Sequence, residues 1–251
     1  MRISRREFVT LTGTAITTLA IAPACAMASS EDQTFARLTV RPKKGVKTTA
    51  AGTTRLGLGG ARDGVLQMPA KVPDTPMPLL LLFHGASSTG ERQLNRFGTI
   101  PSDAGVAVLS LDSRGQTWDA IGPSGFGPDV AFINRALDKV FSQVSVDPTR
   151  LTIGGFSDGA SYALSLGLIN GDLFPKIAAF SPGFLVPGET QGKPRIFVSH
   201  GVADDVLPIN QCSRVIVPEL KKRGYDVTFR EFDGKHEAPP AVVTEAFKWM
   251  A

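Results

Sequence analysis

Cysteine and histidine are scarce in this chain of 251 residues, which contains two cysteines, Cys25 and Cys212, and three histidines. If Cys25 is removed with an N-terminal leader, one thiol remains and no internal disulfide can form. No group of cysteines and histidines has the spacing of zinc ligands. The glycine-rich stretch at residues 57–60 is not followed by a helical pattern, so it does not predict a dinucleotide loop. We therefore expect neither a metal nor another cofactor, and we expect Cys212 to pack in the core as a small apolar side chain.

An excess of charge of one sign is also lacking. The formal net charge is +4, but three arginines and one glutamate lie in the first 28 residues, which leaves 24 basic and 22 acidic residues in the rest. Two short basic runs, Arg41–Lys44 and Lys221–Arg223, are typical of a solvated surface rather than of a nucleic-acid footprint. We expect no nucleic-acid partner.

The sequence has no apolar run long enough for a comfortable membrane span, which takes about 20 residues. The run from Phe8 to Ala22 has fifteen residues, follows Arg5-Arg6, and is followed by the small residues of Ala24–Ala28. A basic start, an apolar middle and small residues at the end are typical of a secretory signal. The paired arginines resemble the twin-arginine export class.

We therefore predict that residues 1–28 are a cleaved signal peptide of the twin-arginine type. Residues 29–251 are then exported to the periplasm or secreted, with transient contact to the export machinery and no stable membrane insertion. An uncleaved amphipathic anchor is one alternative. Lipidation at Cys25 is another, although Ala22-Pro23-Ala24 is a poor lipoprotein motif.

From residue 79 onward, patterns of buried strands alternate with patterns of helices. Short apolar runs predict strands at residues 79–83, 106–111, 151–153, 177–180, 196–198 and 227–232. Between and after them, apolar residues recur at helical spacing over residues 129–144, 160–168, 210–223 and 242–250. This alternation predicts an α/β fold with a mostly parallel central sheet and helices on both faces. Only about 15 residues separate Phe180 from Ile196, which excludes a large cap domain there, so we expect residues 29–251 to form a single domain.

The pattern is weaker elsewhere. Phe35–Val40 alternates weakly and predicts an edge strand, and Arg55–Met68, interrupted by glycines, predicts a twisted hairpin at the sheet edge. Asp129 is expected to cap the helix that follows it. Gly224 is expected to close the helix at residues 210–223, in which Pro218 is an awkward residue. Residues 86–99, 113–128 and 181–194 are interpreted as loops.

The sequence Gly-Phe-Ser-Asp-Gly at residues 155–159 has the Gly-x-Ser-x-Gly pattern of a nucleophile elbow, a sharp strand-to-helix turn that exposes the serine hydroxyl. Glycine is needed on both sides because the turn is tight. A short apolar run before the motif and a helical pattern after it provide the required order of strand, turn and helix. Ser157 is therefore the candidate nucleophile. Asp158 is expected to interact favourably with the dipole of its helix.

A serine hydroxyl needs a base to accept its proton. All three histidines follow predicted strands, where the active residues of such sheets gather. Hydrolases built on this elbow have the order Ser, then Asp or Glu, then His. Only His200 and His236 follow Ser157, and a carboxylate must lie between the serine and the base. Asp204 meets this condition, with Asp172 and Glu189 as rivals, and His236 is then the base. His84 and His200 are expected to brace loops by hydrogen bonding.

The chain from about residue 79 resembles the α/β-hydrolase superfamily, and within it the compact carboxylesterases of the phospholipase/carboxylesterase and dienelactone-hydrolase type. Four motifs carry the resemblance: His-Gly-Ala at residues 84–86, the elbow, His-Gly-x-x-Asp from residue 200 with Val206–Pro208, and Gly-x-His from residue 234. In that family the first aspartate after His-Gly is the acid of the triad, which implies Asp204 rather than the adjacent Asp205. Many relatives have proline at the position of Asp205, and a second carboxylate so close is expected to affect the pH profile.

The resemblance implies a serine esterase with the triad Ser157, His236 and Asp204 and an acyl-enzyme intermediate. The backbone N–H groups of Ala86 and Asp158 are expected to form the oxyanion hole. Trp118 is a candidate substrate-binding residue, with Phe126 beside it in the same loop, although an aromatic side chain in a loop is as often a packing anchor.

The expected partner is a small-molecule ester. Export without a large cap would also suit an extracellular polyester or a feruloyl-type plant ester, and a peptidase is compatible with this fold. A catalytically inactive binding protein with a hydrolase fold is the alternative from another class.

Overall fold

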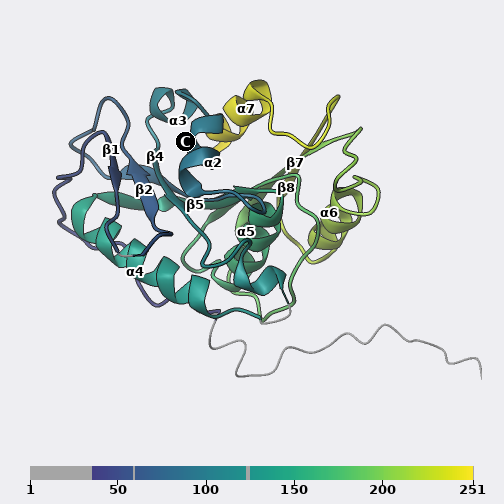
Figure 1. Cartoon of the computed structure of the whole chain (residues 1–251), viewed down its shortest axis with the longest axis horizontal. Coiled ribbons are helices and arrows are strands. Elements are labelled where there is room, and N and C mark those ends of the chain that lie inside the picture. Colours follow the sequence, from purple (N-terminus) through teal and green to yellow (C-terminus); the bar gives the residue numbers. More distant parts are fainter. Residues whose placement is uncertain (1–35, 59, 123–124, 251) are drawn as a thin grey trace, which may run out of the picture.

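The computed structural model describes residues 36–250 except residues 59 and 123–124, so the predicted signal peptide lies outside the described residues. An eight-stranded sheet in the order β1-β2-β4-β3-β5-β6-β7-β8 forms the centre of the molecule (Figure 1). β1 and β2 are antiparallel to their neighbours, and all the other strands pair in parallel. The strands are β1 Thr53–Arg55, β2 Gly64–Gln67, β3 Met77–Phe83, β4 Ala107–Leu111, β5 Val146–Phe156, β6 Lys176–Phe180, β7 Arg195–Gly201 and β8 Val227–Phe232.

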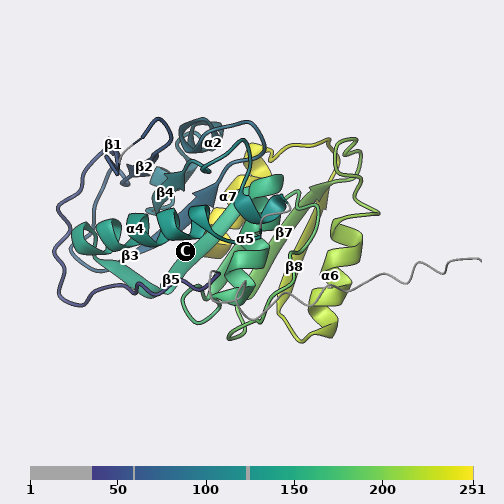
Figure 2. The ribbon, with the colours of Figure 1, turned by 60° about the horizontal axis from the view of Figure 1, so that its bottom comes forward.

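Helices cover both faces of this sheet. The helices are α2 Gly90–Arg96, α3 Ile100–Asp103, α4 Pro128–Gln143, α5 Asp158–Ile169, α6 Ser213–Lys222 and α7 Pro240–Met250, with a 3₁₀ turn at Asp119–Ile121. In Figure 2, α4, α5 and α6 lie in front of the sheet and α7 lies behind it. In Figure 1, α2 and α3 lie on the same side as α7. Within the described residues, no helix is both long and apolar enough to cross a lipid bilayer.

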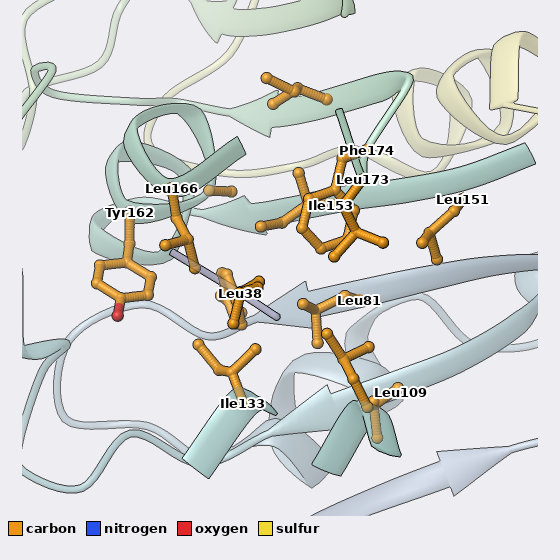
Figure 3. Packing of buried hydrophobic residues seen from close by; sticks show 14 of the residues in the cluster. Leu38, Leu81, Leu109, Ile133, Leu151, Ile153, Tyr162, Leu166, Leu173 and Phe174 are labelled. Carbon is orange, nitrogen blue, oxygen red and sulfur yellow. The ribbon is translucent and has the colours of Figure 1, made fainter. Parts of the chain in front are cut away.

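The continuous apolar run of β3 follows from this arrangement. Leu79 and Leu81 point into the core under α4 and α5, whereas Leu80 and Leu82 point into the core under α2, α3 and α7. Because successive side chains of a strand point to opposite faces, a strand covered on both faces has to be apolar at every position. Figure 3 shows the first of these cores, in which Ile133 of α4 and Leu166 of α5 face the sheet residues Leu81 and Ile153.

Most of the predicted architecture is confirmed. The six predicted strands from residue 79 onward are present in one parallel set, and the predicted hairpin forms the antiparallel edge made by β1 and β2. Residues 181–194, between β6 and β7, contain neither a helix nor a strand, so no cap domain is inserted there.

The predicted edge strand at Phe35–Val40 is wrong over its described part, residues 36–40, which are irregular. Side chains take the place of a neighbouring strand. The Asn170 amide donates to Ala36 O and accepts from Leu38 N, and Asn134 Oδ1 accepts from Thr39 N. Because these amides satisfy the backbone, the segment can place Leu38 in the core without joining the sheet.

Three details of the helices also differ from expectation. The N-cap of α4 is Gly127, and Asp129 lies in the first turn with its carboxylate turned toward the preceding loop. α6 begins at Ser213 rather than at residue 210, although it ends before Gly224 as expected and contains Pro218. The interval 86–99 is not a plain loop, because α2 begins after Thr89, whose Oγ accepts from Arg92 N.

The elbow depends on glycine for close packing, and this gives a test. A Cβ built on Gly159 would lie 2.5 Å from the carbonyl oxygens of Phe83 and His84, which are backbone atoms that cannot easily move. We expect Gly159→Ala to lower the free energy of unfolding by about 1–3 kcal/mol, as overpacking does. Urea denaturation followed by circular dichroism measures this. Gly115→Ala is the control, because a Cβ there meets only Thr117 O at 3.4 Å. Equal stability of the two variants would contradict the close-packing argument.

Candidate active site

Ser157 lies where β5 ends and α5 begins. Its φ of 57° and ψ of −123° are strained for a residue with a Cβ, and its backbone N–H donates to Phe180 O of the adjacent strand at 2.9 Å. The residue is 9% exposed. Asp158 lies in the first turn of α5, as expected for an acidic residue at a helix N-terminus. The sharp turn thus leaves the serine hydroxyl near the surface at the carboxyl edge of the sheet.

His236 lies in the loop between β8 and α7 and reaches back over the elbow. Its Nε2 is 2.9 Å from Ser157 Oγ, and its Nδ1 is 2.7 Å from Asp204 Oδ2. The imidazole packs against the ring of Phe156, with 4.8 Å between ring centroids. With Nδ1–H donating to the carboxylate, Nε2 is left as the acceptor for the serine proton. The structure therefore brings the three expected residues into one continuous line of hydrogen bonds.

Asp204 lies in the loop after β7, and its carboxylate is fully engaged. Oδ1 accepts from Val206 N at 3.0 Å and from Leu207 N at 2.8 Å, while Oδ2 faces His236. Burial alone would raise the pKa of Asp204. The hydrogen bonds from Leu207 N, from the His236 side chain and from Val206 N outweigh that effect and hold the pKa of Asp204 below its ordinary value. Asp204 is therefore ionised at neutral pH.

The rival carboxylates lie elsewhere. Asp205 is exposed, and its nearest cation is Lys235 Nζ at 3.4 Å. Asp172 forms ion pairs with Arg37 and Arg41, and Glu189 is exposed in the loop after β6. Of these carboxylates, Asp204 is the one that contacts the His236 imidazole.

His200 braces the loop that carries Asp204, in keeping with its expected role. Its Nε2 lies 2.7 Å from Leu207 O and 3.1 Å from Asp204 Oδ2, and its Nδ1 lies 2.7 Å from Ser213 Oγ. Two acceptors at Nε2 assign the proton to that nitrogen, so Nδ1 accepts from the serine hydroxyl. Burial is the main cause that lowers the pKa of His200. The ring is therefore neutral, and it positions Asp204 without neutralising the charge that Asp204 presents to His236.

The loop after β3 runs directly beside the elbow. A Cβ built on Gly85 would lie 3.2 Å from Ser157 Cβ. His84 Nδ1 donates to Gly85 O at 2.6 Å, and its Nε2 accepts from Ser113 N at 3.0 Å, as expected of a bracing residue. Ser87 N donates to Gln116 O at 2.7 Å. Among the described residues, no hydrogen bond uses the N–H of Ala86 or that of Asp158, so both are free to bind a developing oxyanion.

Trp118 does not line an open pocket. It is 1% exposed, its ring stacks on Tyr162 at 5.1 Å, and its Nε1 donates to His84 O at 2.9 Å. The structure therefore corrects the expected substrate contact, since Trp118 is a packing anchor under the loop after β3. Phe126 is buried against the same tyrosine. An indole N–H needs a partner when buried, and here the partner is a carbonyl of that loop.

Two carboxylates, the buried Asp129 and the half-buried Asp119, hold the long loop between β4 and α4. Asp129 accepts from Arg114 N and Asp119 N, and Asp119 accepts from the Tyr162 hydroxyl and from Asp129 N. Burial, followed by the neighbouring charge of Asp119, raises the pKa of Asp129 to about 6. The carboxylates replace backbone pairing in a loop rich in glycine and proline. No group of three or more metal-ligating side chains occurs among the residues that the structure describes.

A hollow of about 330 Å³ opens next to His236. It is lined by Gln93, Arg96, Phe97, Phe156, His236, Glu237 and Ala238. The sequence pattern did not single out α2, which contributes two of these residues. The sequence does contain a signal for α2. Thr89 is suited to an N-cap, and the apolar residues Leu94 and Phe97 follow it at helical spacing.

Residues 128–251 match the family model described as phospholipase/carboxylesterase. A solved S-formylglutathione hydrolase, FrmB from Staphylococcus aureus, superimposes with a TM-score of 0.64 at 16% identity, covering 80% of this chain and 98% of that one. The chain has an α/β-hydrolase fold.

Two relatives of the chain are described as esterases. The chain is 28% identical over 220 residues to the putative esterase NocK of Nocardia uniformis subsp. tsuyamanensis, covering 82% of this chain and 57% of that protein. It is 25% identical over 181 residues to the probable feruloyl esterase C of Aspergillus niger, covering 58% of this chain and 67% of that protein. The chain thus spans little more than half the length of the Nocardia relative. The family model is described as phospholipase/carboxylesterase, and both relatives are described as esterases.

The contact between His200 and Asp204 can be tested by substitution. We expect His200→Leu to lower kcat/KM for p-nitrophenyl acetate about 10- to 100-fold, because loss of a hydrogen bond to a charged group costs about 1.5–3 kcal/mol. His200→Gln should retain more activity, since its terminal amide can still donate to the same oxygens. Rates should be normalised to active sites titrated with a fluorophosphonate, so that misfolded protein is not counted. Wild-type activity per titrated site in both variants would contradict this role.

The raised pKa of Asp129 predicts a pH dependence of stability. Its ordinary pKa is 3.8 and its folded-state pKa is about 6, so between these values the folded protein binds more protons than the unfolded chain. The free energy of unfolding should therefore fall as pH rises through this window, by roughly 2–3 kcal/mol at most. Asp129→Asn cannot titrate, so between pH 4 and 7 it should lose less stability than the wild type in urea denaturation. If the free energy of unfolding fell equally in both proteins between pH 4 and 7, the raised pKa of Asp129 would be contradicted.

Proposed function

We propose that the protein is a serine hydrolase that cleaves carboxylic esters through a triad of Ser157, His236 and Asp204. The observation that carries the proposal is the line of hydrogen bonds from Ser157 Oγ to His236 Nε2, 2.9 Å, and from His236 Nδ1 to Asp204 Oδ2, 2.7 Å. The orienting acid is ionised and buried, and the nucleophile sits on a strained turn. These are the features that acyl transfer through a serine requires.

In the first half of the reaction, His236 Nε2 accepts the proton of Ser157 Oγ as that oxygen attacks the ester carbonyl. Asp204 holds the imidazole in the required tautomer and stabilises the imidazolium that forms. The carbonyl oxygen becomes an oxyanion, to which the N–H groups of Ala86 and Asp158 donate; one such donor lowers the barrier by about 3–4 kcal/mol. The tetrahedral intermediate then expels the alcohol, which takes the proton from His236 and leaves an acyl-enzyme.

In the second half, water attacks the acyl carbonyl while His236 accepts a proton from it. A second oxyanion forms at the same two N–H groups. Its collapse breaks the bond to Ser157 Oγ, which recovers its proton from His236, and the carboxylic acid is released.

The proposal is tested at the nucleophile. Ser157→Ala should lower kcat for p-nitrophenyl acetate by at least about 10⁴-fold, as removal of a triad serine does, and should abolish fluorophosphonate labelling. Ser142→Ala, on the exposed side of α4, is the control and should keep wild-type kinetics and labelling. Persistent turnover in Ser157→Ala would refute the assignment.

A polymer or plant-cell-wall ester is the second candidate substrate class. It is favoured by the similarity to a probable feruloyl esterase. It is also favoured by the loop between β6 and β7, in which residues 181–194 contain no helix or strand that could form a cap over the site. Release of ferulate from methyl ferulate, compared with acid release from p-nitrophenyl esters of increasing acyl length and from a polyhydroxyalkanoate film, separates the classes. An inactive binding protein with this fold would neither react with the fluorophosphonate nor hydrolyse any of these esters.

We also propose that the protein is exported, with residues 1–28 removed as a twin-arginine signal. The support is the sequence pattern, since these residues lie outside the described part of the chain. Expression of the full chain in a bacterium, followed by N-terminal sequencing of periplasmic protein, should find a start near residue 29. Replacing Arg5 and Arg6 by lysine should stop this processing, and an intact N-terminus on periplasmic protein would contradict cleavage.

A further inference from the structure

The hollow beside His236 has a place in the proposed reaction. It lies between α2 and the loop after β8, and it is also lined by Phe156, the residue before Ser157. The group that leaves the tetrahedral intermediate takes its proton from His236 Nε2, so the leaving oxygen must lie next to this imidazole. The hollow is therefore positioned to hold the alcohol part of an ester.

Gln93 is the unusual residue in this hollow. It is 1% exposed, and among the described residues its Oε1 is buried without a hydrogen-bond partner. A buried polar atom without a partner is costly, and native proteins have few of them. A side-chain amide has a donor end and an acceptor end. An amide held in this way in a hollow that His236 also lines is suited to bind a polar group of the substrate.

The charges around the hollow do not select an ionic group as the partner of this amide. Arg96 and Glu237 both line it, and among the described residues neither forms a salt bridge with another side chain. A carboxylate or phosphate would be attracted by Arg96 but repelled by Glu237, and an ammonium group would be attracted by Glu237 but repelled by Arg96. A neutral hydroxyl avoids both conflicts and, like the amide, both donates and accepts. Phe97 and Phe156 offer apolar surface for the carbon skeleton that carries the hydroxyl groups.

We propose that this hollow is the alcohol subsite and that the preferred substrates are esters of polyhydroxylated alcohols, such as a glycerol or a sugar, bound through Gln93. The inference rests on the proposed esterase function and deepens it. The acyl group is then held on the other side of Ser157, and selectivity for the alcohol comes from α2.

The test compares two acetate esters that share the acyl group and differ in the alcohol: glycerol monoacetate and n-propyl acetate. Acid release in a pH-stat gives kcat/KM for each, per active site titrated with a fluorophosphonate. We expect kcat/KM of the wild type to be at least about fivefold higher for the glycerol ester, because one net hydrogen bond to the substrate gives a factor of this size. Gln93→Met has nearly the same shape without the amide, and its preference should fall to near unity.

The control variant is Gln143→Met, a helical glutamine near the C-terminal end of α4, which should retain the wild-type ratio. Gln93→Met should melt at the same temperature as the wild type or higher, since it removes an unsatisfied buried atom.

Two results overturn the inference while the proposed function stands: the wild type shows no preference for the glycerol ester, or Gln93→Met keeps that preference. A lower melting temperature with equal losses on both esters also overturns it, because Gln93 would then be structural. If no ester is hydrolysed and Ser157 is not labelled, the proposed function fails and the subsite fails with it.

Discussion

The close approach of the start of α5 to the ends of β3 and β5 is the constraint on which the rest of the site depends. Gly159 packs against the carbonyl oxygens of Phe83 and His84, and a Cβ on Gly155 would collide with Gly159 O. Without side chains at these two positions, the helix can begin immediately after the strand. The residue between them, Ser157, is forced to a positive φ, which turns its hydroxyl out of the sheet. The same packing brings the loop after β3 against the serine, so the two N–H groups suited to an oxyanion lie on segments that touch.

The electrostatic design around Asp204 depends on which of its neighbours carry charge. Two backbone N–H groups and His236 stabilise the carboxylate against the cost of burial. His200, although 3.1 Å away, stays neutral because it is buried. A second cation at this point would compete with the imidazolium that the proposed reaction forms at His236. His236 is therefore the partner of Asp204 that becomes positively charged in the proposed reaction.

The sequence predicted what depends on periodicity and chain order. Apolar runs located the central strands, because a strand covered on both faces must be apolar throughout, and the order of Ser157, an acid and a histidine singled out His236. The choice between Asp204 and Asp205 came from family resemblance, since adjacent residues differ only in the direction of their side chains. Trp118 was misjudged for the same reason: its place in the chain does not reveal that its N–H faces inward to His84 O. The irregular segment at residues 36–40 depends on amides about 95 to 134 residues away, which no local pattern can show.

Backbone strain in the described residues is concentrated at the carboxyl ends of the parallel strands. The three non-glycine residues with positive φ are Ser87, Ser157 and Ser181, at 54°, 57° and 53°. They follow β3, β5 and β6, which are consecutive neighbours in the sheet order. Ser181 and Gln93 each also have a buried side-chain oxygen without a hydrogen-bond partner among the described residues, as do Thr152 and Tyr225 farther from the site. Strain and unsatisfied polar atoms lower stability, and they persist where the surrounding core is strong enough to hold them. Here the two apolar layers of the sheet supply that strength, and the strained backbone positions lie at the strand ends where substrate would bind.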